Sequence, residues 1–405
     1  MAEQDRIIIV GAGPVGCITA LALVQKGVPV LQLEALAETP TAHRAATTHA
    51  STLDLLDGVG MSAPVIEQSV IARHFQYRYR ETNEVFAEFD FARLEGETNH
   101  PYAVQLEQHK TVAIALEMLS AHPHYTLHRL HEAVGIEQTV DHVKLTTQTP
   151  DGSQHDWHGR YVIACDGGRS FVRKSQGIDF PGFTWEERFM IVATLFDFEK
   201  ADNYRYRNYI ADPDRWCSVF KIPGPDGKGM WRNLFPVTEN DPEDVVMSDN
   251  WIRARYDECF PYARDTEIVH RNLYTVHQRV AASFRKGRVM LAGDSAHINN
   301  PLGGMGMNSG IADGLNLAEK MVAVWRGEAG EELFDRYDRQ RRPLAQKYVQ
   351  AQSIQNKETL QAKDAAKATV RFEELRKTAE DPKRHKAFLM NSSLINMVRE
   401  AAAID

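Results

Sequence analysis

The segment Ile-Ile-Ile-Val-Gly-Ala-Gly-Pro-Val-Gly at residues 7–16 decides the fold predicted for this chain. Its four leading apolar residues form the continuous run that is typical of a strand buried on both faces of a parallel sheet. Residues 17–26 follow with helical periodicity, and Gly27 ends that helix. Residues 28–33 form a second buried strand with Glu34 at its carboxyl end. These elements make a βαβ unit of the usual size, about 30 residues.

Each residue of the glycine-rich turn has a distinct physical role. Gly11 permits the tight turn, Gly13 lets the backbone approach a pyrophosphate, and Gly16 lets helix and strand pack closely. Pro14 suits the first helical turn, whose free N–H groups and positive dipole end favour phosphate. Glu34 can accept hydrogen bonds from ribose hydroxyls and would repel a 2′-phosphate. The motif therefore predicts bound FAD or NAD rather than NADP.

Two further glycine-containing stretches each follow a predicted buried strand: Cys-Asp-Gly-Gly-Arg-Ser at residues 165–170 and Leu-Ala-Gly-Asp-Ser-Ala-His at residues 291–297. Alone, either stretch is typical of an ordinary turn after a strand. The second leads into Pro-Leu-Gly-Gly-Met-Gly-Met-Asn at residues 301–308, where small residues at a helix start allow close approach to a flat ligand. The helix dipole there would stabilise negative charge on a reduced flavin. Together the three stretches predict an enzyme built around one FAD.

Composition excludes several other classes of protein. At roughly 150 residues per domain, 405 residues predict two or three domains. The net charge of -8 argues against a nucleic-acid partner. The four cysteines show no CxxC spacing, so neither a metal site nor a disulfide framework is expected. Without an apolar run of about 18 residues or a leader pattern, we expect a cytoplasmic protein with no membrane segment.

The predicted fold class is α/β, in three parts. A Rossmann-like FAD-binding domain with a parallel sheet is expected from residues 1–70, 98–180 and 275–330. An inserted antiparallel sheet that carries the substrate pocket is expected from residues 71–97 and 181–274, which are rich in aromatic and β-forming residues. Residues 331–405 are charged, alanine-rich and helical in pattern, and we expect them to form C-terminal packing helices or a dimer contact.

Several single elements are also predicted. A helix after residue 43 has Ser51 or Thr52 as its N-cap. Another helix covers residues 242–259, and the strand at residues 274–279 returns to the first domain. The last helix of the FAD-binding domain begins near Asn308 or Ser309 and ends near Trp325.

The three stretches together resemble those of the single-component (class A) flavoprotein aromatic hydroxylases, the p-hydroxybenzoate hydroxylase group, over about residues 5–350. Residues 274–308 and the Trp-Glu-Glu-Arg segment at residues 185–188 are similar to the branch of para-nitrophenol 4-monooxygenases and hydroxypyridine monooxygenases. The resemblance implies that NADH or NADPH and O₂ hydroxylate a small phenol or hydroxypyridine through a flavin C4a-hydroperoxide. It implies attack para to the ring hydroxyl, with or without displacement of the substituent there, and a homodimer.

The resemblance also assigns the cofactor residues. Glu34 matches the ribose acid, and Arg44 matches the arginine near the FAD diphosphate. Gln108 matches the glutamine at the ribityl chain, with Gln105 as its alternative. Asp166 matches the aspartate that serves both FAD and the nicotinamide cofactor. Asp294, which follows Gly293 in the turn, matches the aspartate at the flavin ribityl chain. The wall beside the isoalloxazine is matched by Pro301 and the glycines after it, and the expected cofactor residues of this segment are Gly293, Asp294, Pro301, Gly303, Gly304, Gly306, Met307 and Asn308. Ser295 stands where the family often has alanine.

The phenolic proton must be removed, and histidine suits that task, but the sequence does not identify the base. The candidate catalytic residues are His74, His277, His297 and Pro301, and His43 and His49 also fall near the expected pocket. Candidates for the substrate wall are Tyr209, Trp216, Trp231 and Phe235, with Arg232 for an anionic substituent. Each of these residues has a structural alternative, as a core side chain or a solvated arginine.

Two other functions fit the same FAD site. One is a non-oxygenating flavin reductase or dehydrogenase. The other is a flavin-binding sensor of redox state that performs no turnover. The sequence leaves both open, together with the identity of the aromatic substrate and its leaving group.

Overall fold

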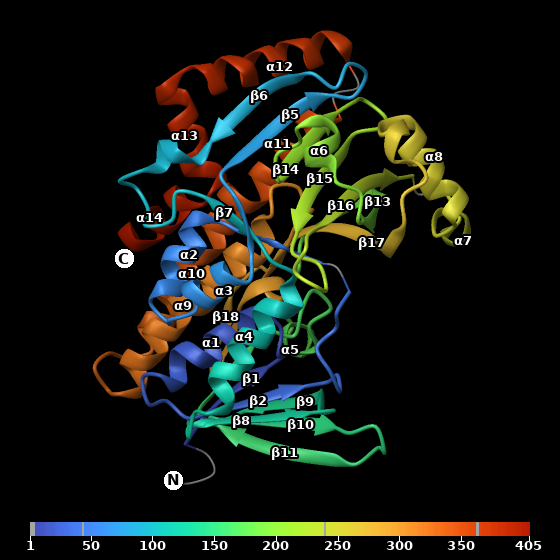
Figure 1. Cartoon of the computed structure of the whole chain (residues 1–405). Helices are drawn as coiled ribbons and strands as arrows, with labels where there is room; N and C mark the ends of the chain where they lie inside the picture. Colours follow the sequence, from blue (N-terminus) through green and yellow to red (C-terminus); the bar gives the residue numbers. More distant parts are fainter. Residues whose placement is uncertain (1–4, 43, 239, 362–363) are drawn as a thin grey trace.

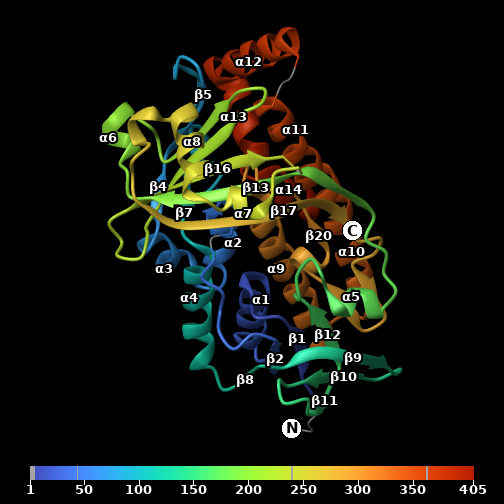
Figure 2. The same ribbon diagram turned by 90° about the vertical axis from the view of Figure 1, so that its right-hand side faces the viewer.

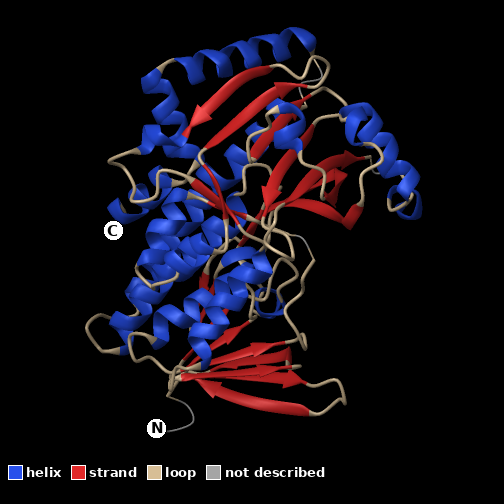
Figure 3. Cartoon of the chain, viewed as in Figure 1, coloured by secondary structure: helices blue, strands red, loops and turns tan. Residues whose placement is uncertain are grey.

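The computed structural model describes residues 5–42, 44–238, 240–361 and 364–405. In Figure 3 most helices lie between a group of strands at the bottom of the view and a large sheet in the upper half. Figure 1 shows which parts of the chain supply each layer. The predicted α/β class, with a parallel sheet, a separate antiparallel sheet and C-terminal helices, is confirmed.

The predicted βαβ unit forms the centre of a six-stranded sheet with the order β18-β19-β12-β1-β2-β8. Neighbouring strands run parallel except for β18 and β19. The strands are β1 (Ile7–Val10), β2 (Val30–Glu34), β8 (Tyr125–Arg129), β12 (Tyr161–Ala164), β18 (Arg285–Lys286) and β19 (Val289–Leu291). Four of them end in one row across the sheet, made by Leu33, Val10, Ala164 and Leu291. All three glycine-containing stretches therefore leave the sheet at the same edge.

Helices cover this sheet: α1 (Pro14–Val24), α2 (Ala50–Asp57), α3 (Ser62–Glu67), α4 (Gln108–Ser120), α5 (Phe171–Ser175) and α9 (Met305–Trp325). Helices α1 and α9 pack so closely that a Cβ on Gly314 would lie 2.1 Å from Thr19 Oγ1. The start predicted for α9, near Asn308 or Ser309, was wrong by three or four residues. Gly304 takes the left-handed φ of +69° at the N-cap, so the helix begins directly after it.

The N-cap predicted for α2 was also wrong. His49, not Ser51 or Thr52, occupies that position. The hydroxyl of Ser51 donates instead to the carbonyl oxygen of Ser393 at 2.6 Å. A tertiary contact with the C-terminal region has therefore taken the side chain that local sequence assigned to capping.

Two small sheets flank the main layers. One has the order β11-β10-β9 and lies at the bottom of Figure 1. It is made of β9 (Glu132–Gln138), β10 (Val143–Gln148) and β11 (Gln154–Gly159). The other joins β3 (Thr47–Thr48), β7 (Ala103–Gln105) and β4 (Val70–Ala72).

The large sheet has eight strands in the order β20-β17-β13-β16-β15-β14-β5-β6. Its strands are β5 (His74–Tyr79), β6 (Val85–Asp90), β13 (Gly182–Thr194), β14 (Arg207–Ala211), β15 (Cys217–Ile222), β16 (Met230–Val237), β17 (Ile268–Val280) and β20 (His297–Ile298). Residues 274–279, predicted as a strand that returns to the first domain, are part of β17, which pairs with β13 along nearly its whole length. Its end pairs with β20, which ties the large sheet to the turn after β19.

The two faces of the large sheet have different partners. One face packs against α6 (Phe198–Asp202), α7 (Glu243–Val246) and α8 (Asp249–Cys259), and Figure 2 turns α7 and α8 toward the viewer. The single helix predicted over residues 242–259 is broken, because Ser248 caps α8 by accepting a hydrogen bond from the backbone N–H of Trp251. The other face carries a second aromatic cluster, which also contains Leu302 from the loop before α9 and residues of the C-terminal helices.

The C-terminal region is closely integrated with both layers. It contains α10 (Glu332–Leu344), a π-helix (Ala345–Gln350), α11 (Ala351–Leu360), α12 (Ala365–Glu380), α13 (Pro382–Ser392) and α14 (Ile395–Ala403). Helix α12 packs on the edge strand β6, at the top of Figure 1, and α14 returns to α10 and α2. Within the described ranges, none of these or the earlier helices combines the length and apolar character needed to cross a bilayer.

A buried ionic cluster joins α9, α10 and the turn after β19. Asp313 contacts Arg341 Nε and His297 Nε2, each at 2.7 Å, and accepts the backbone N–H of Gly293 at 3.2 Å. Burial would raise the pKa of Asp313, but His297 and Arg341 outweigh burial and hold it below its usual value. The cluster therefore fixes the turn after β19 to α9 and α10.

Removing Arg341 should leave the buried carboxylate of Asp313 without its guanidinium partner. We expect Arg341→Met to lower the free energy of unfolding by about 3–5 kcal/mol, measured by urea denaturation. The neighbouring Arg342 pairs with Asp338 in a partly exposed i,i+4 salt bridge. Arg342→Met should therefore lower the free energy of unfolding by at most about 1 kcal/mol. Equal losses in the two variants would contradict the assignment.

Candidate functional site

A long cavity runs along the edge of the parallel sheet in two adjoining parts of about 380 and 280 Å³. Both parts are lined by Gly13, Arg44, Gln108, Cys165 and Gly167. The first cavity extends toward the end of β2, and the second extends toward the large sheet. The two parts together suit an extended ligand.

The glycine turn has the geometry that its three predicted roles require. Gly11 has a φ of +102°, and a Cβ there would lie 2.3 Å from the carbonyl oxygen of Cys165. A Cβ on Gly16 would lie 2.1 Å from the carbonyl oxygen of Gly11, so helix and turn touch. At Gly13, in contrast, a Cβ would meet no atom within 4 Å. Its backbone opens onto the cavity, as contact with a pyrophosphate demands.

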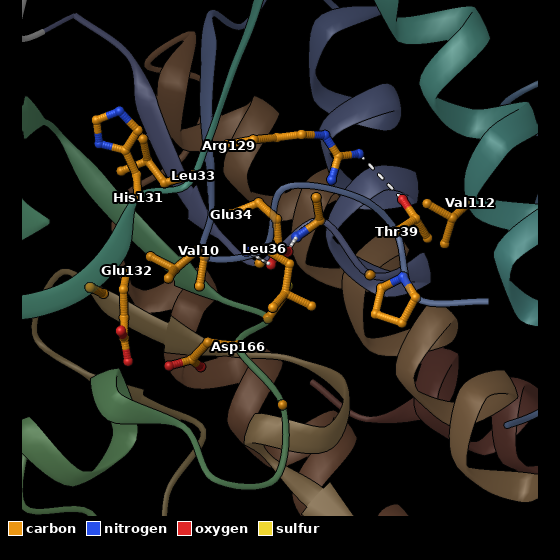
Figure 4. A pocket seen from close by; sticks show the side chains of 18 of the residues that line it. Val10, Leu33, Glu34, Leu36, Thr39, Val112, Arg129, His131, Glu132 and Asp166 are labelled. Carbon is orange, nitrogen blue, oxygen red and sulfur yellow. Dashed lines mark hydrogen bonds between the residues drawn. The ribbon is translucent and has the colours of Figure 1, made fainter. Parts of the chain in front are cut away.

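The carboxylate of Glu34 is fixed against the same turn. It accepts hydrogen bonds from the backbone N–H groups of Ala12 at 2.7 Å and Leu36 at 2.9 Å. Figure 4 shows Glu34 in the first cavity together with Arg129, which donates to Thr39 at 3.3 Å. A carboxylate oxygen has two lone pairs, so Glu34 can still accept hydrogen bonds from ribose hydroxyls.

Asp166 lies in the first cavity (Figure 4) with one oxygen free. Its Oδ2 accepts the backbone N–H of Val172 at 3.1 Å, whereas its buried Oδ1 has no partner among the described residues. Burial raises its pKa, although hydrogen bonds from Ser170 and Val172 oppose that shift. Arg173 does not face the cavity; it donates to the carbonyl oxygens of Gly168 and Ser295 and so orders the loop. The unsatisfied Oδ1 and the open Gly13 both fit a bound FAD.

The second cavity is walled by the turn after β19 and the start of α9. Asp294 is exposed to it, and since protein surrounds the cavity, burial raises its pKa, with His297 and Arg44 opposing. Of the cofactor residues predicted from the sequence, those that line either cavity are Gly11, Gly13, Pro14, Glu34, Arg44, Gln108, Asp166, Asp294, Pro301, Gly304, Gly306 and Met307.

Four predicted cofactor residues lie behind the cavity surface. Gly16 and Gly293 are packing positions against the turn and Val15. Asn308 is fully buried and holds two loops together, since it donates to Thr47 O at 2.8 Å and accepts the backbone N–H of His49 at 2.8 Å. Gly303 lines a separate small cavity. Gln105, the alternative to Gln108, is fully buried against Thr47.

The face of the large sheet opposite α8 carries two buried guanidinium groups, those of Arg207 and Arg232. Arg232, which the sequence proposed for substrate, lines the second cavity with Phe220. Arg207 lines the small cavity with Tyr209, to whose hydroxyl it donates at 2.9 Å. In the part of the chain that the structure describes, neither arginine forms an ion pair, and burial lowers the pKa of Arg232. Arg207 lies over the aromatic rings of Phe75, Tyr209 and Phe220, which offset part of the cost of burying it. A buried guanidinium group with no carboxylate partner remains costly, and a ligand anion would offset that cost.

Strand alternation turns two of the predicted substrate residues away from the cavities, and a third is buried apart from them. Trp231 and Phe235 alternate with Arg232 along β16 and point to the opposite face, into the cluster under α8. Trp216 is fully buried against Phe189 and lines neither cavity. Tyr209 lies on the correct face, stacked on Tyr77 at 5.1 Å.

The predicted histidine bases lie outside the second and small cavities. His297 is fully buried in the ionic cluster with Asp313. His277 Nδ1 lies 2.9 Å from Thr184 Oγ1, and His74 Nε2 lies 3.7 Å from Asp90 Oδ1. His49 is buried and contacts Gly303 O through Nε2 at 2.7 Å; burial and Arg207 lower its pKa to about 3. His43 lies outside the described residues.

Sequence reasoning missed Arg207, Phe220 and Asn356 as cavity residues. A signal for Arg207 was present, because it lies two residues before Tyr209 in one predicted strand and therefore on the same face. Nothing local marks Asn356, which comes from the C-terminal helix α11.

Comparison with known proteins agrees with this geometry. Residues 4–352 match the model of the family described as FAD binding domain. A para-nitrophenol 4-monooxygenase from Pseudomonas sp. (strain WBC-3) is 32% identical over 90% of each chain. The 6-hydroxy-3-succinoylpyridine 3-monooxygenase HspB from Pseudomonas putida (strain DSM 28022 / S16) is 32% identical over 84% of this chain and 85% of its own.

Among solved structures, p-nitrophenol 4-monooxygenase PnpA from Pseudomonas putida DLL-E4 has a TM-score of 0.91 at 30% identity and covers 98% of both chains. The resemblance to class A flavoprotein hydroxylases is thereby confirmed over nearly the whole chain. This protein therefore belongs to the FAD-binding family of flavoprotein aromatic monooxygenases.

Proposed function

We propose that this protein uses NADH or NADPH and O₂ to hydroxylate a small phenol or hydroxypyridine that binds as an anion. The observation that carries the proposal is two buried guanidinium groups on one sheet face, neither in an ion pair: Arg232 in the second cavity and Arg207 in the small cavity. Relatives named for p-nitrophenol and for a succinoylpyridine support it, because an acidic phenol and a carboxylate-bearing ring are both anionic near neutral pH.

The proposed FAD site uses residues that already face the cavity. Glu34 would accept hydrogen bonds from the ribose, and Gly13 and the start of α1 would hold the pyrophosphate. Asp166 and Asp294 would accept hydrogen bonds from the remaining part of the cofactor. The start of α9 beyond Pro301 would face the isoalloxazine. When bound, FAD supplies the redox chemistry with the nicotinamide and oxygen.

The arginines offer a physical route to substrate activation without a dedicated histidine base. No histidine is found among the described residues that line the second or small cavity. A nearby cation favours the charged form of a phenol and lowers its pKa. Arg232 would therefore bind the ring oxygen as an oxyanion, which enriches the para carbon in electrons. We propose attack at that carbon, with displacement of a substituent already present there.

Filling the open space at Gly13 tests the FAD site. Its φ of -75° and ψ of -178° suit a β-branched residue, so Gly13→Val should fold normally while its side chain occupies the cavity. We expect FAD affinity to fall at least about 100-fold, the scale of a lost near-3-kcal/mol contact. Visible flavin absorbance after gel filtration measures retention, and the melting temperature of the FAD-free protein is the control. A yellow variant would contradict this placement.

Turnover separates the proposed reaction from its alternatives. With FAD bound, a panel of para-substituted phenols and hydroxypyridines should accelerate NADH or NADPH oxidation at least about 10-fold, with matching O₂ uptake and hydroxylated product by mass spectrometry. Release of the para substituent as an ion would support displacement. Steady NAD(P)H oxidation that no phenol changes would favour a reductase, and none at all would favour a redox sensor.

Charge at Arg232 should discriminate ionised from neutral ligands. We expect Arg232→Met to weaken binding of an ionised phenol by roughly 10- to 100-fold, as for a lost charge-assisted hydrogen bond, and Arg232→Lys to retain part of it. Flavin absorbance changes on titration measure the affinity. Arg253→Met, on α8 at the opposite face of the sheet, is the matched control. Equal affinity of both Met variants would refute the anion site.

A further inference from the structure

The C-terminal region contains a π-helix directly before α11. It covers Ala345–Gln350 and follows Pro343, which lies inside α10 and lacks the backbone N–H that a regular helix would use. π-Helical turns are rare and are frequently found at functional sites. Here the turn precedes a helix whose residues contact the loop at residues 298–303, which lies beside the second cavity.

Three positions of this helical segment, three residues apart, contact alternate residues of that loop. Gln350 Nε2 donates to the carbonyl oxygen of Ile298 at 2.9 Å. The carbonyl oxygen of Ser353 accepts from Asn300 Nδ2 at 3.0 Å. Asn356 Nδ2 donates to the carbonyl oxygen of Leu302 at 3.1 Å. The helix thus holds the loop along its length as far as the residue before Gly303.

The large sheet supports the middle of this ladder. Gln278 on β17 donates to Ser353 Oγ at 2.9 Å and accepts the backbone N–H of Asn300 at 3.1 Å. Gln278, Ser353 and Asn300 are buried. A buried and satisfied polar network holds one arrangement, because any shift would leave polar atoms without partners.

Asn356 has a second contact surface that the other two positions lack. It lines the small cavity together with Arg207, Tyr209 and Gly303. The cavity holds only about 10 Å³, roughly the space of one water molecule. A Cβ on Gly303 would lie 2.5 Å from Asn356 Nδ2, so the amide touches the loop backbone. The amide therefore sets the gap between the loop and the arginine-bearing sheet face.

We propose that Asn356 is a positioning residue that sets the shape of the substrate end of the site by fixing the backbone of Leu302 and Gly303. The proposal rests on the proposed function of the second cavity. It gives the C-terminal helices a role in ring recognition and assigns the π-helix the task of bringing Gln350, Ser353 and Asn356 into register with the loop.

The test compares Asn356→Asp and the milder Asn356→Ser with Gln355→Ala, an exposed neighbour on the same helix. The aspartate is nearly isosteric but loses the donor and places a carboxylate against the Leu302 carbonyl. With FAD bound and no substrate present, both Asn356 variants should change the visible circular dichroism of the flavin, because the wall of its cavity moves. Gln355→Ala should match the unmodified protein.

Titration with 4-nitrophenol provides the second readout. We expect its dissociation constant to rise at least about 10-fold in the Asn356 variants, with FAD affinity changed less than about threefold, because Asn356 does not line the long cavity. Flavin dichroism identical to the unmodified protein, or an equal loss of FAD affinity, would overturn the proposal. An unmodified protein that forms no product from any phenol would refute the proposed function, and the dichroism comparison would still decide the role of Asn356.

Discussion

The structure depends on one constraint, the shared edge of the parallel sheet. Because β2, β1, β12 and β19 end in a single row, the residues that follow them emerge side by side. Glu34, the glycine turn, Asp166 and Asp294 lie up to 283 residues apart in the sequence, yet all line the two adjoining parts of one long cavity. Ligands of open α/β sheets bind at this carboxyl edge for the same reason.

Close backbone packing makes that edge possible. The glycine turn touches the end of β12, and α1 touches α9 where Gly310 and Gly314 leave no room for a side chain. The ionic cluster around Asp313 then ties the turn after β19 to α9 and α10. The carboxylates that face the cavity are thus held by the scaffold before any ligand binds, which lowers the cost of ordering them on binding.

The large sheet supplies a different kind of surface. Its strict alternation sends Trp231 and Phe235 into one core and Arg232 toward the cavity. The same alternation places Arg207 and Tyr209 together on the cavity side. Aromatic side chains and unpaired cations therefore share one face, an environment suited to a flat anionic ring.

The sequence by itself determined the βαβ unit, the three glycine-containing stretches, the α/β class and the family, because these depend on local periodicity and on residues whose roles are set by backbone geometry. Most of the cofactor residues that it predicted, from Gly13 and Glu34 to Asp294 and Pro301, line the long cavity. Only the tertiary structure decided which face of a strand an aromatic residue takes, since a strand such as β16 has both apolar and polar residues on each side. Only tertiary structure could show that Ser51 binds Ser393 rather than capping its helix, that His297 is a buried partner of Asp313, and that Asn356 lines the small cavity. Those outcomes depend on contacts between residues far apart in the chain, which local sequence patterns do not encode.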